Sequence, residues 1–304
     1  MTRVLMPFPA DAALASTMNQ AMQARIAPVA WRHFPDGESL VTLEDSLAGA
    51  DVAILASLRH ADALALPLRF AARTAREFGA RSVGLIAPYL GYMRQDTRFH
   101  RGEAVSTPLF AQFLEEAFDW LVTVDPHLHR VERLQSLYRI PTVHVSATPA
   151  VARWIAETVP DAVLIGPDSE SEQWVADIAA LSSMPYQVLA KERHGDYDVR
   201  VSLPDPAAVA GRTPVLIDDI VSSGHTILET LAHLRRLSLP SPLLVAIHPV
   251  FAGDAYARLQ EAGLARIVST DTISHPSNAI ALGADLAAAA STLMTASTDS
   301  PEDP

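Results

Sequence analysis

The sequence contains no cysteine and little positive charge. Without a thiol, its 304 residues cannot form a disulfide, a Cys-ligated zinc site or a sulfur nucleophile. The sequence has only 23 Lys and Arg residues against 35 Asp and Glu residues, which gives a formal net charge of −12. This balance disfavours nonspecific attraction to nucleic acids or anionic membranes. We therefore expect no nucleic-acid or membrane partner, and any phosphate ligand must be held by local groups.

Long hydrophobic runs are also missing. The start, MTRVLM, lacks the features of a secretory signal. The most apolar late stretch, residues 279–294, is Ala-rich and shorter than the roughly 20 residues of a membrane span. We expect a cytoplasmic protein in which residues 279–294 form a packed C-terminal helix. Residues 295–304 are small, acidic or Pro, which predicts a disordered tail.

Short apolar runs alternate for the most part with helical segments, which predicts α/β architecture with mainly parallel sheets flanked by helices. The runs, rich in Val, Ile and Leu, are residues 52–56, 82–86, 120–124, 163–165, 214–217 and 243–247. Helices are expected at residues 64–78, 107–118 and 148–158. At 49% hydrophobic residues the chain is long enough for two domains, which we place at residues 1–146 and 147–278. The halves share this alternating plan without a close sequence repeat.

The strongest local signal is residues 215–226, VLIDDIVSSGHT. It predicts a strand, a loop and a helix that opens at Ile227. Such a loop directs backbone N–H groups and hydroxyls at one point beside a helix N-terminus, which suits a phosphate monoester. Asp218 and Asp219 suit sugar hydroxyls or a hydrated Mg²⁺. The simpler alternative is a serine-capped helix after an acidic turn.

This segment resembles the loop that binds 5-phosphoribosyl 1-pyrophosphate (PRPP) in type I phosphoribosyltransferases and ribose-phosphate pyrophosphokinases. Two segments of the first half separate these families: residues 34–38, FPDGE, and residues 88–96, PYLGYMRQD, are similar to pyrophosphokinase segments that the transferases lack. Further matches follow in the family's order, and they are VDPH at 124–127, GPD at 166–168, KER at 191–193 and TDTI at 270–273. The resemblance covers most of the chain and implies two phosphoribosyltransferase-like domains, the first binding ATP and the second ribose 5-phosphate.

The resemblance also implies an activity. In this family the pyrophosphoryl group of Mg-ATP is transferred to C1 of ribose 5-phosphate, which gives PRPP and AMP for nucleotide biosynthesis. The expected cofactor is Mg²⁺. The expected assembly is a homo-oligomer built from dimers, since the family's Phe at position 34 stacks on the adenine of a neighbouring subunit.

The roles of the family's site residues can be assigned to the matching positions of this sequence. The resemblance assigns ATP binding to Phe34, Asp36, Glu38, Arg94, Gln95, Asp96 and His127. It assigns ribose 5-phosphate binding to Asp218, Asp219, Ser222, Ser223, Gly224, His225 and Thr226. It gives metal positioning to His127 and Asp168, and catalysis to the cationic pair Lys191 and Arg193.

Some of these residues have other interpretations. Asp125, His127 and His129 could suggest zinc, but the acid-rich setting favours Mg²⁺. Taken alone, residues 191–198 have the composition of a solvated loop. The alternative is a mobile cationic lid that shields the ATP polyphosphate from water.

Three departures predict a divergent branch: Ser222 where many members carry Asp, His225 in place of a small residue, and an acidic run at 169–172. Two alternatives stay open, a catalytically silent regulatory homologue and a pyrophosphokinase for another pentose phosphate. A transferase that consumes PRPP leaves the ATP segments unexplained.

Overall fold

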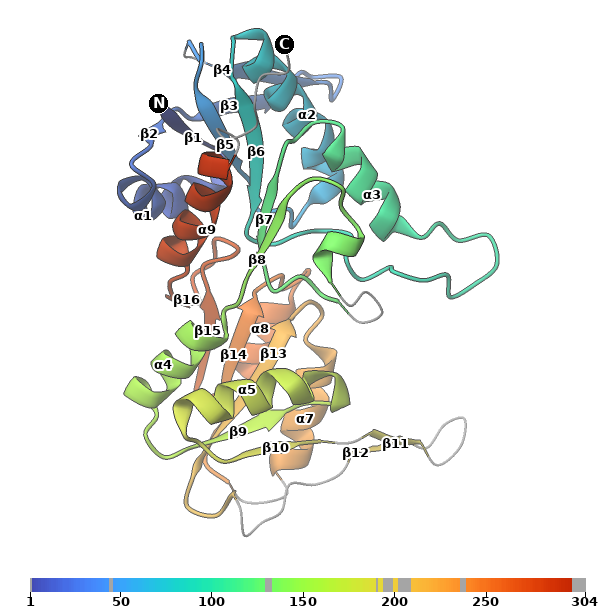
Figure 1. Cartoon of the computed structure of the whole chain (residues 1–304). Coiled ribbons are helices and arrows are strands. Elements are labelled where there is room, and N and C mark those ends of the chain that lie inside the picture. Colours follow the sequence, from blue (N-terminus) through green and yellow to red (C-terminus); the bar gives the residue numbers. More distant parts are fainter. Residues whose placement is uncertain are drawn as a thin grey trace. The chain divides into compact units, whose positions relative to one another are not determined.

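The computed structural model describes residues 2–43, 46–128, 133–189, 191–193, 199–201, 209–235 and 239–296. The chain divides into two compact units (Figure 1). The first unit contains the residues up to 145, residues 272–274 and the segment from 282 onward. The second unit contains residues 146–271 and 275–281. The domain limits placed from the sequence remain a prediction.

The first unit is built on a six-stranded parallel sheet in the order β2-β1-β5-β6-β7-β8. Its central strands are buried along their whole length and mostly apolar, because helices cover both faces. The strands are β1 (Arg3–Pro7), β2 (Arg25–Ile26), β5 (Asp51–Leu55), β6 (Ser82–Ala87), β7 (Leu121–Val124) and β8 (Thr142–Val145). The helices are α1 (Ala12–Met22), α2 (Ala61–Glu77), α3 (Ser106–Glu115) and α9 (Gly283–Ala296). Helix α9 packs against α1 and contacts β6, β7 and β8.

The second unit has a parallel sheet of the same size in the order β10-β9-β13-β14-β15-β16. Its strands are β9 (Ala162–Gly166), β10 (Tyr186–Val188), β13 (Thr213–Ile220), β14 (Leu243–His248), β15 (Arg266–Thr270) and β16 (Asn278–Ile280). The helices of this unit are α4 (Thr148–Thr158), α5 (Glu172–Ser182), α7 (His225–Leu234) and α8 (Ala255–Glu261).

The two units share one topology, which the sequence did not reveal as a repeat. Strands β9, β10 and β13 to β16 occupy the places of β1, β2 and β5 to β8. An antiparallel hairpin interrupts each unit between its second and third sheet strands. The hairpins are β3 (Val29–His33) with β4 (Ser39–Leu43), and β11 (Lys191–Arg193) with β12 (Val199–Val201). The predicted fold class, two similar α/β domains with mainly parallel sheets, is confirmed.

The predicted elements differ from the structure mainly at their ends. Helix α4 has the predicted bounds, whereas α2 begins at Ala61, three residues before the predicted start. Residues 278–280, assigned in part to the C-terminal helix, instead form β16, since they pair with β15. Helix α9 therefore begins at Gly283 rather than at residue 279.

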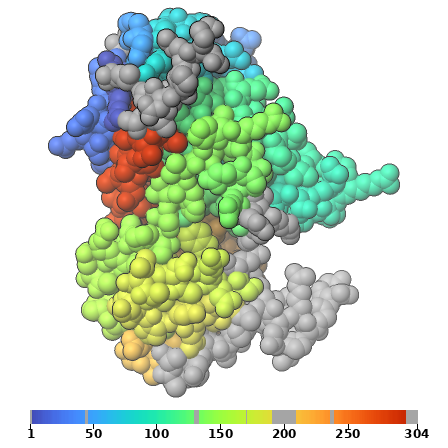
Figure 2. Space-filling view, viewed as in Figure 1, coloured from blue at the N-terminus to red at the C-terminus, as the bar shows by residue number. Residues whose placement is uncertain are grey.

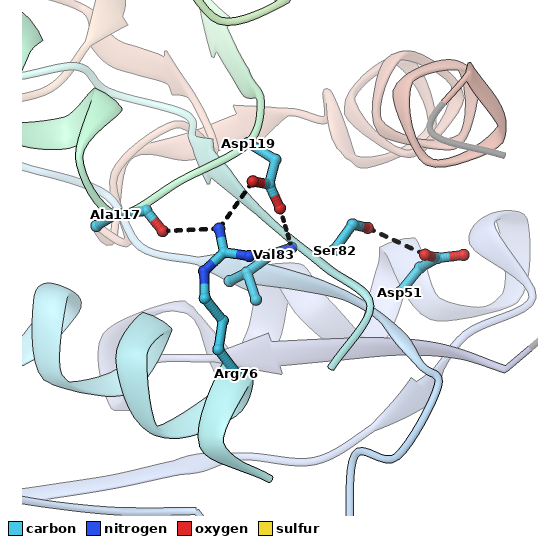
Figure 3. Close-up of polar contacts among 6 residues, drawn as sticks. All are labelled: Asp51, Arg76, Ser82, Val83, Ala117 and Asp119. Carbon is cyan, nitrogen blue, oxygen red and sulfur yellow. Dashed lines mark hydrogen bonds and ion pairs between the residues drawn. The ribbon is translucent and has the colours of Figure 1, made fainter. Parts of the chain in front are cut away.

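Side-chain hydrogen bonds link the amino ends of the first sheet's central strands to each other and to the neighbouring helix α2 (Figure 3). Arg76, at the end of α2, donates to Asp119 over 2.8 Å, and the other oxygen of Asp119 accepts the Val83 N–H over 2.7 Å. Ser82 donates to the buried carboxylate of Asp51 over 3.0 Å. Because ligands of parallel α/β sheets bind at the opposite, carboxyl edge, these contacts stabilise the scaffold and leave that edge available.

None of the helices in the described part of the chain combines the length and apolar character that a bilayer crossing requires.

Candidate functional site

Strand β13 delivers the predicted phosphate loop to the carboxyl edge of the second sheet. Its residues from Pro214 to Ile217 are buried, and Asp218 and Asp219 follow directly. The loop leads into α7, which begins at His225, two residues before the predicted start. The predicted order of strand, loop and helix is therefore present.

Hydrogen bonds with the last residue of β14 and with the chain that follows it hold the backbone of this loop. The Val221 N–H donates to the His248 carbonyl over 3.2 Å, and the Phe251 N–H donates to the Val221 carbonyl over 2.8 Å. The Ala252 N–H donates to the Ser222 carbonyl over 3.0 Å. These bonds fix the loop before a ligand arrives, which lowers the entropy cost of binding.

Gly224 is needed for the turn that opens α7. Its φ is +70°, a left-handed conformation that side chains disfavour. A Cβ at this position would also lie 3.0 Å from the Leu259 side chain. The His225 N–H is 3.4 Å from the Ser223 Oγ, within the first turn of the helix. Backbone N–H groups and the helix dipole at this end favour an anion.

The predicted acids of the second unit come close enough to interact. Burial raises the pKa of Asp218 well above its ordinary value, and the charges of Asp219 and Asp168 raise it further. Asp168 follows β9, which pairs with β13, so adjacent strands supply these carboxylates. Ligands that donate hydrogen bonds, such as sugar hydroxyls, or a cation would relieve this repulsion.

The carboxylates of this site suit a metal ion that takes most of its ligands from ATP and water. Carboxylate oxygen is the protein ligand that Mg²⁺ prefers, and Asp168, Asp218 and Asp219 offer it. Within the described ranges, however, no cluster of three or more His, Asp or Glu side chains is arranged to enclose a metal. One or two protein oxygens could therefore contact a magnesium ion that ATP and water otherwise surround.

Lys191 and Arg193 lie on β11, where the sequence predicted a loop. Lys191 pairs with Val201 and Arg193 with Val199 of the antiparallel strand β12. Residues 194–198, between the two strands, lie outside the described part of the chain, as does His129.

The side chain of His225 points along α7. Its Nε2 is 3.1 Å from Glu229 Oε1, and 72% of the side chain is exposed. Ser222 and Thr226 are half-buried, whereas Ser223 is exposed. The structure therefore brings the phosphate-loop residues together, with His225 at the rim.

In the first unit, Phe34, Asp36 and Glu38 form the tip of the β3–β4 hairpin. The Phe34 N–H donates to the Glu38 carbonyl over 2.7 Å, and Asp36 Oδ1 accepts the Glu38 N–H over 3.2 Å. Phe34 is 39% exposed, and the Arg32 guanidinium lies 4.8 Å from the centre of its ring. An exposed aromatic ring at a fixed turn suits stacking on a partner molecule.

Arg94, Gln95 and Asp96 lie in the loop between β6 and α3, which protrudes from the surface beyond these residues (Figure 2). The Gln95 side-chain oxygen accepts from Ser106 over 2.9 Å, at the start of α3. Arg94 is exposed, and no hydrogen bond, ion pair or ring contact joins it to Phe34, although both lie in the described part of the chain.

His127 is half-buried in the turn after β7. Asp125, at the start of this turn, is buried and has a positive φ of 31°. His144 Nε2, on the neighbouring strand β8, lies 2.7 Å from Asp125 Oδ1. His144 was not predicted from the sequence, because only the pairing of β7 with β8 brings it to this turn.

These features define a class of protein: two α/β units of the phosphoribosyltransferase type, of which the second carries an acidic pair and a loop whose geometry suits an anion. Residues 145–283 match the family description of a phosphoribosyl transferase domain. Residues 4–117 match the description of the N-terminal domain of ribose phosphate pyrophosphokinase.

Curated relatives and a solved structure agree with this class. The ribose-phosphate pyrophosphokinase of Methanopyrus kandleri is 31% identical over 92% of this chain and 96% of its own length. The enzyme of that name from Halobacterium salinarum is 33% identical over 86% of this chain and 90% of its own length. The phosphoribosylpyrophosphate synthetase of Mycobacterium smegmatis shares the fold, with a TM-score of 0.83 and 24% identity over 99% of this chain and 100% of that one. The chain belongs to the ribose-phosphate pyrophosphokinase family.

Proposed function

We propose that this chain is an active ribose-phosphate diphosphokinase, which transfers the β,γ-pyrophosphoryl group of Mg-ATP to the C1 hydroxyl of ribose 5-phosphate. The C1 oxygen attacks the β-phosphorus, the bond from that phosphorus to the α-phosphate oxygen breaks, and AMP leaves. Phosphoryl transfer of this kind depends on positioning and on charge stabilisation more than on covalent catalysis.

The observation that carries the proposal is the loop after β13. It combines the interacting acids Asp218 and Asp219 with a turn at a helix N-terminus that backbone hydrogen bonds already hold in place. In the proposed complex the 5-phosphate binds to Ser222, Ser223, Gly224 and Thr226, with His225 at the rim. The ribose hydroxyls donate to Asp218 and Asp219, which relieves the repulsion that raises the pKa of Asp218.

ATP binding belongs to the first unit in this proposal. Arg94 and Gln95 contact the nucleotide, with Asp96 beside them, and His127 faces the polyphosphate. The exposed Phe34, with Asp36 and Glu38 in the same turn, stacks on adenine that a second copy of the chain binds. We therefore propose a homo-oligomer built from dimers, and a cytoplasmic site of action.

When bound, Mg²⁺ would neutralise phosphate charge. We propose that Asp168 would contact it and that His127 would help to position it. Lys191 and Arg193, both on β11, would stabilise the charge that develops between the β-phosphorus and the departing AMP. A pair of cations on a hairpin can approach the polyphosphate after ATP has entered.

A substrate panel tests this function. Purified protein with Mg-ATP and ribose 5-phosphate is expected to form equal amounts of AMP and PRPP, and other pentose phosphates are expected to react more slowly. Faster AMP release with another pentose phosphate would reassign the substrate. No AMP release with any of them would refute the enzyme proposal.

A further inference from the structure

The turn that carries His127 is held by Asp125 and His144, two residues to which the family resemblance assigned no role. Asp125 opens this turn with a φ of 31°, a left-handed conformation that is unfavourable for a non-glycine residue. Its N–H donates to the Val145 carbonyl at the end of β8 over 3.1 Å. Surrounding structure must hold such a residue in place, and here the adjacent strand does so.

The carboxylate of Asp125 makes a second contact with the same strand. His144 Nε2 lies 2.7 Å from Asp125 Oδ1, where an Nε2–H donates to the carboxylate. The Asp125 side chain is fully buried, whereas 41% of the His144 side chain is exposed. A buried carboxylate is costly unless it accepts hydrogen bonds, so His144 stabilises this conformation of the turn.

A similar arrangement occurs in the second unit, where Asn278 on the edge strand β16 takes the place of His144. Asp271, at the end of β15, donates its N–H to the Ile280 carbonyl over 3.1 Å, as Asp125 does to Val145. Asn278 pairs with Ser269 in register, as His144 pairs with Thr123.

Asn278 reaches back to the end of the neighbouring strand, as His144 does. It donates to the Thr270 carbonyl over 2.5 Å and to the Ser269 hydroxyl over 3.0 Å. The edge strand of each unit thus holds the preceding strand's carboxyl end with one polar side chain. In the first unit that side chain holds a carboxylate instead of backbone and hydroxyl oxygens, and the residue held lies two positions before His127.

We propose that His144 is a positioning residue for nucleotide binding: through Asp125 it fixes the turn that presents His127. This inference rests on the proposed function, because it assumes that His127 faces Mg-ATP. His144 itself does not contact substrate in the proposal. Partners of this kind, one step removed from a metal or phosphate contact, typically change affinity or activity by about 10- to 100-fold when they are lost.

Two variants of His144 separate positioning from general stability. His144→Leu removes the donor, and His144→Asn replaces it with the side chain that the second unit uses. Arg81→Leu is the matched control, since Arg81 Nε donates over 3.0 Å to Asp51, another buried carboxylate, at the opposite edge of the same sheet. Both leucine variants are expected to lower the melting temperature.

Binding of Mg²⁺ with α,β-methylene ATP, whose α–β bridge cannot be cleaved in this reaction, is measured by calorimetry below the melting temperature of every variant. We expect about 10-fold weaker binding in His144→Leu, most of which His144→Asn recovers, and wild-type binding in Arg81→Leu. The KM for ribose 5-phosphate is expected to stay within about twofold, since that substrate binds to the second unit.

Wild-type affinity in His144→Leu would overturn the inference, as would an equal loss in Arg81→Leu. Wild-type protein that binds the nucleotide complex but forms no AMP would instead refute the proposed function, because the binding comparison does not require turnover. The two proposals can therefore fail separately.

Discussion

Asp11 gives the most specific prediction about stability. This carboxyl is buried beside the carboxyl ends of β1 and β5, and burial raises its pKa from 3.8 to about 6, although the Ser57 N–H donates to it over 3.1 Å. The folded state therefore binds the Asp11 proton more tightly than the unfolded state does. Stability from this group is complete below pH 3.8 and is lost as the pH rises towards 6.

The size of the effect follows from the two pKa values. A shift of about two units corresponds to a penalty of about 3 kcal/mol at pH 8 and roughly half of that at pH 5. Asp11→Asn removes the titration and keeps an oxygen that can accept from Ser57. The variant is therefore expected to gain stability relative to wild type as the pH rises. At about 2–4 °C per kcal/mol, the gain in melting temperature is several degrees larger at pH 8 than at pH 5.

Differential scanning calorimetry of both proteins at several pH values measures this gain. Asp254→Asn is the control for the loss of one negative charge, since the Asp254 side chain is 77% exposed. A melting-temperature difference between Asp11→Asn and wild type that does not change with pH would refute the reasoning, as would the same pH dependence in Asp254→Asn.

Three further substitutions test the scaffold and the phosphate loop. Gly84→Ala is expected to lower the free energy of unfolding by about 3 kcal/mol or more, because the new methyl group would overlap the Trp120 ring, and chemical denaturation measures the loss. Asp218→Asn is expected to raise the melting temperature, since it removes a buried and repelled charge, and to raise the KM for ribose 5-phosphate; a lower melting temperature would contradict this account. Gly224→Ala is expected to weaken ribose 5-phosphate binding at least 10-fold, since φ is +70° and Leu259 fills the space, and unchanged binding in calorimetry would show that the turn adapts.

The sequence predicted β5, β6, β7, β9, β13 and β14, whose apolar residues are buried, but it did not predict β2, β8, β10, β15 or β16. Strands that are buried on both faces are uninterrupted apolar runs, and β6 and β14 are recognisable for this reason. The hairpin β3–β4 has only two fully buried residues, so its sequence carries no clear period. Residues 278–280 were assigned in part to the helix because three residues are too few to show strand character against the apolar stretch that follows.

The sequence predicts which candidate site residues lie near one another only where they are close along the chain. Asp218, Asp219 and the phosphate loop form one segment, so their proximity requires only a strand and a turn. That Asp168 interacts with Asp218 depends on β9 lying beside β13, which is a property of strand order. The contact of His144 with Asp125 depends on the register of β7 and β8. Local patterns of residue type do not contain either kind of information.

The proposed activity is best tested by measuring the formation of AMP and PRPP from Mg-ATP and ribose 5-phosphate with wild type and Lys191→Ala. Wild type is expected to form equal amounts of both products. The variant is expected to be about 10²- to 10³-fold slower, as for the loss of one preorganised charge. No AMP above the blank across Mg²⁺ and phosphate concentrations would contradict the proposed activity, and an unchanged rate in Lys191→Ala would contradict the proposed role of the β11 cations.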